Sequence, residues 1–343
     1  MSAPFRLGPI AIEHPFFLAP MAGISNSPFR RLARELGSSV VVSELVSSNG
    51  LHYNSGKTMD LLRYHPSERP VGLQIFGESE ANLVEATRVI EKLGADFVDL
   101  NLGCPVPKVV KKGGGAAMCR DPIGLGFILA KMVQAVKIPV TIKIRTGWDE
   151  GTRNALEVVK AATDAGVAWV AIHGRTRAQG YAGHADWDFI GEIKARAKIP
   201  IIGNGDVLSP EIAVQRYRET GVDAVMIGRG ALRNPFIFQQ ARDLLLLGKK
   251  PVEPVPDDYV RLIDRQRTFL SEVYDPPHAM LHVRKFLSWY STGFPGSHEF
   301  RKTVFSSKSP EELWSAARRF FELTAGRRDN RQLGEAFLMG GHG

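Results

Sequence analysis

The sequence predicts a parallel (β/α)8 TIM barrel followed by a small all-helical C-terminal domain. From Phe16 to Leu232, eight short apolar runs rich in β-branched residues alternate with helical patterns, and successive runs begin roughly 30 residues apart. Beyond residue 256 the apolar periodicity is helical throughout. A chain of 343 residues is long enough for a full barrel and one appended domain.

The strands are expected at the apolar runs themselves. They lie in residues 16–23, 38–46, 71–77, 95–103, 139–147, 169–176, 200–207 and 224–232. Related segments recur, such as KIPVTIKI and KIPIIGNG, or GADFVDLN, GVAWVAIH and GVDAVMIG. An open doubly wound sheet is the competing fold, but no Gly-x-Gly-x-x-Gly follows the first strand, and eight strands favour the barrel.

Capping signals delimit the helices. Ser27-Pro28 opens a helix that Gly37 closes, and Ser209-Pro210 opens another that Gly221 closes. The proline-rich segment 248–256 reads as a linker. We therefore predict four parts: a barrel over 1–247, a linker over 248–256, a helical domain over 257–326 and a tail over 327–343. Helices are expected in the helical domain at 257–274, 277–293, 297–305 and 309–326.

Composition indicates a soluble globular protein of the cytoplasm. The chain is 44% hydrophobic and 23% charged, no apolar run approaches the roughly 18 residues of a membrane span, and the N-terminus lacks the order of an export signal. Two cysteines, Cys104 and Cys119, argue against a disulfide scaffold. No metal-ligand spacing such as Cys-x-x-Cys is present, so no metal site is expected.

Polar residues cluster where a barrel carries its chemistry, at the carboxyl ends of the strands. Lys143 gives the strongest signal, because burying an ammonium group without a partner is costly. A structural ion pair inside the barrel is the alternative explanation of Lys143. The residues at these strand ends are Asn101, Cys104, Lys143, Arg145, His173, Arg175, Asn204 and Asp206.

Two glycine-rich loops predict a phosphate site. Residues 204–207 and 228–231 follow the seventh and eighth strands, where barrels commonly hold a phosphate, and Arg229 adds a positive charge. Tight strand-to-helix turns would also explain these glycines. Cys104, at an ordinary thiol pKa of about 8.5, is suited to donate a proton, although a cysteine is more often a small buried apolar residue, as we expect for Cys119.

Taken together, these motifs resemble the tRNA-dihydrouridine synthases, and lean toward the bacterial B-type branch. The resemblance covers residues 16–326 and follows the family's order at every strand. Single motifs such as APMAG are weak, but the joint set with the cysteine-bearing loop is specific. It rests on APMAG at 19–23, NLGCP at 101–105, KIR at 143–145, HGRT at 173–176, NGD at 204–206 and GRG at 228–230.

The resemblance implies an FMN-dependent enzyme that uses NADPH, or NADH, to reduce the C5=C6 bond of selected uridines in tRNA, with the D loop as the expected location. It implies hydride transfer from flavin N5 to C6 and a proton from Cys104 to C5. When the family's roles are assigned by motif, the residues in contact with the flavin ring would be Ala19, Pro20, Met21, Gln74 and Lys143. The residues that hold the flavin phosphate would be Asn204, Gly205, Asp206, Gly228 and Arg229. The residues near the uracil or its phosphodiester would be Asn101, Arg145, His173, Arg175 and Arg177.

A net charge of +8 fits a polyanionic partner, here tRNA rather than DNA or a membrane, bound by a monomer. Residues 282–308 hold five Lys and Arg against Glu299 alone, with Trp289, Tyr290 and Phe300 interleaved. These aromatic residues would equally serve as the core of the helical domain. Two other functions stay open: an FMN-barrel reductase of a small free pyrimidine, as in dihydroorotate dehydrogenases, and a non-redox RNA-binding protein.

Overall fold

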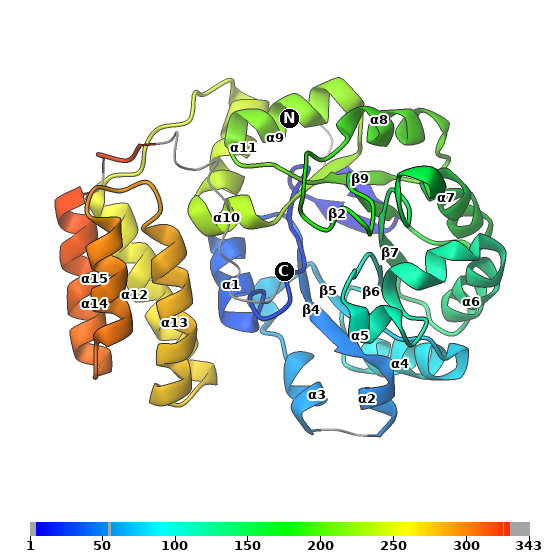
Figure 1. Ribbon diagram of the computed structural model, residues 1–343, viewed down its shortest axis with the longest axis horizontal. Helices are drawn as coiled ribbons and strands as arrows, with labels where there is room; N and C mark the ends of the chain where they lie inside the picture. Colours follow the sequence, from blue (N-terminus) through cyan, green and yellow to red (C-terminus); the bar gives the residue numbers. More distant parts are fainter. Residues whose placement is uncertain (1–4, 54–55, 325, 330–343) are drawn as a thin grey trace.

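A computed structural model describes residues 5–53, 56–324 and 326–329 and contains the predicted barrel (Figure 1). Its eight parallel strands are hydrogen-bonded in the order β3-β10-β9-β8-β7-β6-β5-β4. Backbone hydrogen bonds from Leu18 to Val40 and from Ser39 to Phe16 close the ring. Each strand overlaps a predicted segment: β3 (Phe16–Leu18), β4 (Val41–Ser47), β5 (Val71–Phe76), β6 (Phe97–Leu102), β7 (Val140–Arg145), β8 (Val170–His173), β9 (Ile201–Asn204) and β10 (Ala224–Ile227).

Helices cover the outside of the barrel and bury their apolar faces against it. The expected helix over Ser27 begins as predicted, but Asn26 is its N-cap and accepts a hydrogen bond from the Phe29 backbone. Gly221 ends its helix in the left-handed conformation, as predicted. The outer helices are α1 (Ser27–Glu35), α2 (Ser48–His52), α3 (Gly56–Leu61), α4 (Glu80–Lys92), α6 (Pro122–Gln134), α7 (Ala155–Asp164), α8 (Trp187–Arg196), α9 (Pro210–Thr220), α10 (Arg229–Arg233) and α11 (Ile237–Leu247).

The amino-terminal end of the barrel is filled by apolar side chains. A hairpin of β1 (Phe5–Leu7) and β2 (Ile10–Ile12), which the sequence patterns did not predict, packs Leu7 and Ile12 against the barrel interior. Phe97 lies so close to the backbone of Gly72 that a Cβ atom there would meet its ring at 2.1 Å. The amino-terminal end of the barrel interior is therefore a packed core.

The carboxyl-terminal half of the interior is polar because the strands are in register. Gln74 pairs with Asp99, Asp99 with Thr141, and Asn101 with Lys143. Since side chains alternate along a strand, these residues all point inward together. The strand pairing thus gathers polar residues that are distant in the sequence.

The C-terminal helices form the predicted helical unit beside α1 (Figure 1). They are α12 (Pro256–Val273), α13 (Pro276–Tyr290), α14 (Ser297–Ser306) and α15 (Pro310–Thr324). Phe29 of α1 stacks on Phe286 at 4.9 Å between ring centroids, and Arg31 lies 3.9 Å over the Phe269 ring. Of the three aromatic residues proposed for RNA contact in the basic window, Tyr290 and Phe300 are buried, so these two form core rather than an RNA surface. Most of the predicted tail, residues 330–343, lies outside the described residues.

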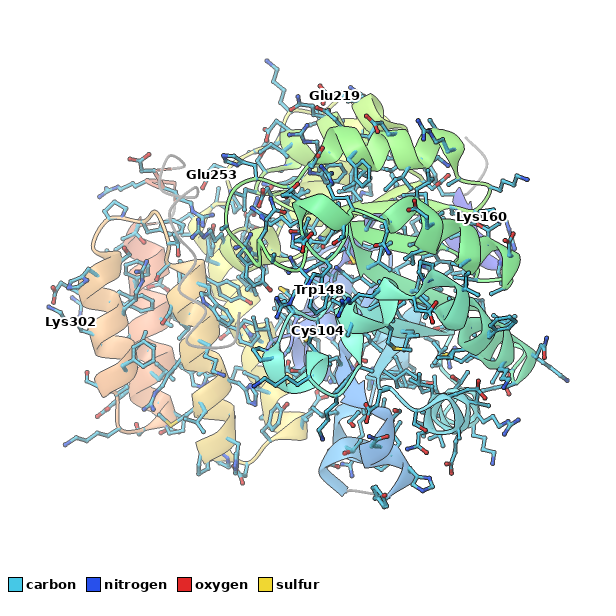
Figure 2. The ribbon with its side chains drawn as sticks, turned by 45° about the vertical axis from the view of Figure 1, so that its right-hand side comes forward. Cys104, Trp148, Lys160, Glu219, Glu253 and Lys302 are labelled. Atoms are coloured by element: carbon cyan, nitrogen blue, oxygen red, sulfur yellow. The ribbon has the colours of Figure 1, made fainter. Side chains whose placement is uncertain are left out.

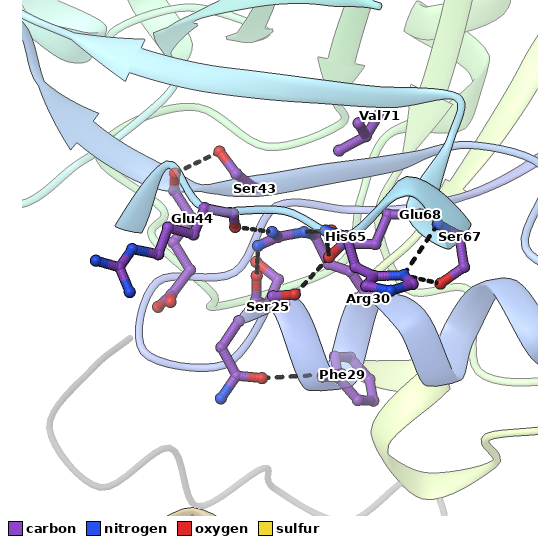
Figure 3. Close-up of polar contacts among 12 residues, drawn as sticks. Ser25, Phe29, Arg30, Ser43, Glu44, His65, Ser67, Glu68 and Val71 are labelled. Carbon is purple, nitrogen blue, oxygen red and sulfur yellow. Dashed lines mark hydrogen bonds and ion pairs between the residues drawn. The ribbon is translucent and has the colours of Figure 1, made fainter. Parts of the chain in front are cut away.

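A buried ion pair fixes α1 to the barrel (Figure 3). Arg30 Nε donates to Glu68 Oε2 at 2.6 Å, and both side chains are at most 1% exposed. Arg30 also donates to the carbonyl of Ser25 at 2.6 Å and to that of Arg63 at 3.0 Å. The guanidinium therefore joins the turn before α1 to the segment that leads into β5.

Replacing Glu68 with alanine should lower the free energy of unfolding by about 3–5 kcal/mol, because it leaves the Arg30 charge buried without its partner. The matched control is Glu299→Ala, which breaks the exposed pair with Lys302 and should cost less than about 1 kcal/mol. Urea unfolding followed by circular dichroism measures both. Equal losses in the two variants would contradict this role for the buried pair.

Candidate active site

A cavity of about 300 Å³ opens at the carboxyl-terminal end of the barrel, where the sequence predicted the chemistry. One part of its wall is apolar, and the rest carries cations and polar groups. Its lining residues are Ala19, Pro20, Met21, Ala22, Leu45, Asn101, Gly103, Cys104, Pro105, Val106, Lys143, Arg145, His173, Tyr181, Asn204, Gly205, Asp206, Val207, Leu208, Gly228, Arg229 and Gly230.

Cys104 lies on the loop after β6 and is half-buried at the cavity wall. Its backbone N–H donates to Asn101 Oδ1 at 2.9 Å, and the Gly103 N–H donates to the same atom at 3.2 Å. Burial raises the pKa of the thiol, against the opposing effects of a Val106 backbone hydrogen bond and the Arg145 charge. Cys104 is therefore protonated at neutral pH and can act as an acid.

Lys143 reaches the same cavity from the end of β7. Burial, together with repulsion from Arg145, lowers its pKa to about 8, and the nearby Asp99 opposes this effect. The charge of Asp99 acts on Lys143, but no ion pair joins these two described side chains, and the ammonium group lines the cavity. An ammonium group with a pKa near neutrality is the kind of perturbed group found at functional sites.

The arginines after β7 and β8 hold the loops around the cavity. Arg145 lines the cavity but donates to the carbonyls of Gly103, Thr176 and Gly180 at 2.7–2.9 Å. It therefore ties the loop of Cys104 to the loop after β8. The charge also contributes to the positive potential of the site, although burial lowers the Arg145 pKa to about 10.

His173 is neutral at the end of β8. Burial, reinforced by the surrounding cations, lowers its pKa well below the ordinary value. Arg175 Nη1 lies 3.3 Å from His173 Nε2, and because an arginine can only donate, Nε2 is the acceptor and Nδ1 carries the proton. Arg175 itself lies behind the lining and donates to Asp206 and to the carbonyls of Ala182 and Gly183.

The glycine-rich loops after β9 and β10 form the remaining wall. Gly205 has φ of +127°, and a Cβ at Gly230 would meet the Val207 carbonyl oxygen at 2.1 Å, so both positions require glycine. Asp206 accepts from Arg175 at 2.8 Å and from Arg229 at 3.4 Å. The Asp206 carboxylate therefore orients the guanidinium groups of Arg175 and Arg229.

Three predicted residues do not line the cavity: Gln74, Arg175 and Arg177. Gln74 is fully buried beneath it, between Asp99 and Asn101. The guanidinium of Arg177 lies 4.6 Å over the ring of Trp148, which is labelled with Cys104 in Figure 2. Within the described residues, no group of three or more His, Cys, Asp and Glu could hold a metal ion, and no helix there is long and apolar enough to cross a membrane.

Sequence patterns missed Tyr181, which lies on the loop after β8 and lines the cavity. The residue is 42% exposed, and its ring centroid lies 4.8 Å from the Arg229 guanidinium carbon and 6.3 Å from the centroid of the His173 ring. The only signal was one aromatic residue between Gly180 and Gly183 in a loop that follows several predicted site residues. Leu45 and Leu208 were also missed, since apolar residues near strand ends look like core.

Solved structures share the barrel. Histamine dehydrogenase from Rhizobium sp. 4-9 superimposes with a TM-score of 0.55 at 14% identity, over 78% of this chain and 50% of that one. The 6-hydroxypseudooxynicotine amine oxidase of Pseudomonas geniculata N1 gives 0.56 at 16% identity, over 76% and 52%. The chain spans about half the length of these two proteins, and the likeness concerns the fold alone.

Sequence comparison is far more specific. The tRNA-dihydrouridine synthase B of Pseudomonas aeruginosa is 39% identical over 317 residues, which cover 92% of this chain and 95% of the relative. A probable tRNA-dihydrouridine synthase of Rickettsia prowazekii is 37% identical over 89% and 94% of the two chains. The family model for dihydrouridine synthase (Dus) matches residues 17–324, which include both the barrel and the C-terminal helices. The chain therefore belongs to the dihydrouridine synthase family.

Proposed function

We propose that this dihydrouridine synthase reduces the C5=C6 bond of uridines in the D loop of tRNA, with FMN as its bound cofactor and NADPH as the reductant. One observation carries the proposal: a single cavity brings together an apolar wall, the cation Lys143 and a protonated thiol at Cys104. We further propose that the chain acts as a monomer in the cytoplasm.

The lining of the cavity suits a flavin with a phosphate group. Ala19, Pro20 and Met21 offer an apolar surface for a flat ring, and Lys143 offers a donor at its edge. Gln74 is buried beneath the cavity and donates one N–H of its amide to Asp99. The second N–H would be the group that contacts the flavin ring.

The phosphate would lie against the loops after β9 and β10. Gly228 and Gly230 let backbone N–H groups approach an anion, and Arg229 supplies a positive charge. Asn204 donates to the Met226 carbonyl at 2.7 Å, and Asp206 accepts from Arg229. Both side chains would therefore hold the loops and Arg229 in place and would not bind the phosphate themselves.

Bound flavin would supply the hydride that enters the uracil at C6. Negative charge then develops from C5 toward the conjugated carbonyl oxygen, and Cys104 would donate the proton that completes saturation at C5. Lys143 would stabilise the developing charge from inside the cavity. The protein thus positions and polarises the substrate while the cofactor carries out the redox step.

Uracil recognition would involve Asn101, His173 and the loop-holding arginines. Asn101 and His173 line the cavity, and neutral His173 keeps a donor at Nδ1. Arg145 and Arg175 would act mainly through the loops they hold. Arg177, beside Trp148 and outside the cavity, would contact the RNA next to the target base. A uridine must turn out of its RNA context to enter, at a cost of a few kcal/mol.

We propose that residues 1–247 form the flavin-binding domain, 248–256 a linker and 257–326 the tRNA-binding domain. Helix α13 brings the cation Lys285 near the cavity: His282 Nδ1 of the same helix lies 3.3 Å from Asn26 Nδ2, and the charge of Lys285 acts on Glu44. Glu44 in turn accepts a hydrogen bond from Gly23, next to the cavity wall. An RNA whose uridine enters the cavity would therefore pass Lys285.

Replacing Lys285 with alanine should weaken tRNA binding and reduce the slope of log K against log salt concentration by about 0.9, the contribution of one phosphate contact. Flavin content should stay unchanged. The matched control is Lys302→Ala, whose ammonium is already paired with Glu299 and should matter less. Filter binding at several salt concentrations measures both, and identical slopes in the two variants would contradict a phosphate contact at Lys285.

Turnover with competing substrates tests the proposed function. The purified chain should be yellow, and unmodified tRNA should accelerate NADPH oxidation, whereas orotate and free uracil should not. Acceleration by a free pyrimidine alone would favour the small-molecule reductase. A colourless preparation that binds tRNA but oxidises no NADPH would favour a non-redox RNA-binding protein.

A further inference from the structure

A continuous path of side-chain hydrogen bonds joins the barrel interior to the loop of Cys104. Gln74 Nε2 donates to Asp99 Oδ2 at 2.7 Å, and Asn101 Nδ2 donates to Gln74 Oε1 at 2.8 Å. Asn101 Oδ1 then accepts from the backbone N–H groups of Gly103 and Cys104. The path begins at Asp99, which is 4% exposed, and ends at the proposed acid.

Each link has a direction, and Asp99 sets it. An amide side chain has an oxygen at one end and an NH₂ group at the other, so its neighbours decide which way it faces. Asp99 offers Gln74 an acceptor, which turns the Gln74 oxygen toward Asn101. Asn101 must then direct its NH₂ group to Gln74 and its oxygen to the backbone of Cys104.

The direction does not depend on the charge of Asp99. Burial raises the pKa of Asp99, while hydrogen bonds from Gln74 and Thr141 and the charge of Lys143 lower it. The hydroxyl of Thr141 lies 2.6 Å from Asp99 Oδ1 and 3.2 Å from the Val98 carbonyl oxygen. A proton on Oδ1 would therefore point to Thr141, whose hydroxyl would turn to Val98, and Oδ2 would remain the acceptor of Gln74.

We propose that Asp99 is a positioning residue that orients the amides of Gln74 and Asn101 and thereby holds the backbone of Cys104 so that the thiol faces the cavity. The importance of this thiol rests on the proposed function, whereas the orientation of the loop does not. Asp99 touches neither the cavity nor Cys104 directly, so its effect passes through two amides.

A charge exchange between positions 99 and 101 tests the relay. In Asn101→Asp, the new carboxylate has no N–H to donate to Gln74 Oε1, and the two oxygens face each other, so this link of the path is broken. In the double variant Asp99→Asn with Asn101→Asp, each donor and acceptor along the path has a partner again, and the hydrogen bonds run in the opposite direction. The amide at position 99 then donates to Gln74 Oε1, Gln74 donates to the carboxylate at 101, and that carboxylate still accepts from Gly103 and Cys104.

Amide hydrogen exchange of the full-length protein as purified reads out the loop without an activity assay. In Asn101→Asp, the amides of residues 103–104 should exchange about tenfold faster, since their acceptor is no longer held in place. In the double variant, exchange should return to within about twofold of wild type. Asp99→Asn alone should resemble wild type, because its new NH₂ group can donate to Thr141. Peptides from β9 and β10 are the internal control and should not change.

Equal exchange in Asn101→Asp and wild type would overturn the relay, as would a double variant that exchanges as fast as Asn101→Asp. If Asn101→Asp is insoluble, recovery of soluble protein in the double variant supports the relay, and continued insolubility contradicts it. These results are independent of dihydrouridine formation. Failure of the relay and failure of the proposed function are therefore distinguishable.

Discussion

Replacing Cys104 with alanine should lower the rate of dihydrouridine formation by about 100-fold or more, the usual contribution of a positioned general acid. The thiol at the cavity wall is protonated, because burial raises its pKa. Flavin binding and flavin reduction by NADPH should continue, since neither needs a proton at C5. Stopped-flow bleaching of the flavin by NADPH separates that step from product formation on unmodified tRNA.

The chain contains its own control for this experiment. Cys119 is buried and its thiol donates to the Leu102 carbonyl at 3.6 Å, outside the cavity lining. Cys119→Ala should therefore keep dihydrouridine formation close to the wild-type rate. Wild-type product formation by Cys104→Ala would reject the proton-donor role.

Replacing Lys143 with alanine should also lower the rate by about 100-fold, as when one donor that stabilises developing charge is removed. Flavin content should fall as well, because the ammonium group lines the cavity in which the ring is proposed to bind. The flavin-to-protein absorbance ratio and the single-turnover rate measure the two effects. Normal values of both would refute the assignment.

The pH dependence of the wild-type rate provides a second test of Lys143. Its pKa of about 8 keeps the ammonium charged below that pH, and the charge is lost as the pH rises further. Burial raises the pKa of Cys104, so the thiol keeps its proton over the same range. The rate should therefore fall above about pH 8. In Lys143→Arg the fall should move to higher pH, and an unchanged profile would show that another group titrates.

The sequence predicted the barrel and most of the cavity because both depend on local patterns. Apolar runs at regular spacing define the strands, and strand ends define which residues can meet. Asn101, Cys104, Lys143, His173 and Arg229 were placed in this way, and all five line one cavity. The glycine-rich loops after β9 and β10 were predictable because glycine marks positions where a side chain does not fit, as at Gly230.

The parts that escaped prediction depend on tertiary contacts. Tyr181 lies in an irregular loop, and its position is set by loops that Arg145 and Arg175 hold through backbone carbonyls. The hairpin of β1 and β2 consists of three-residue strands, which carry too little periodicity to detect. The engagement of Asp206 with two arginines follows from strand neighbours rather than from its loop motif.

The dihydrouridine content of tRNA in cells that lack this protein tests the central claim most directly. Nucleoside mass spectrometry combined with position mapping should show that dihydrouridine is missing from at least one D-loop position. A plasmid with the wild-type sequence should restore it, and a plasmid with Cys104→Ala should not. Unchanged dihydrouridine at every position in the deleted cells would contradict the account.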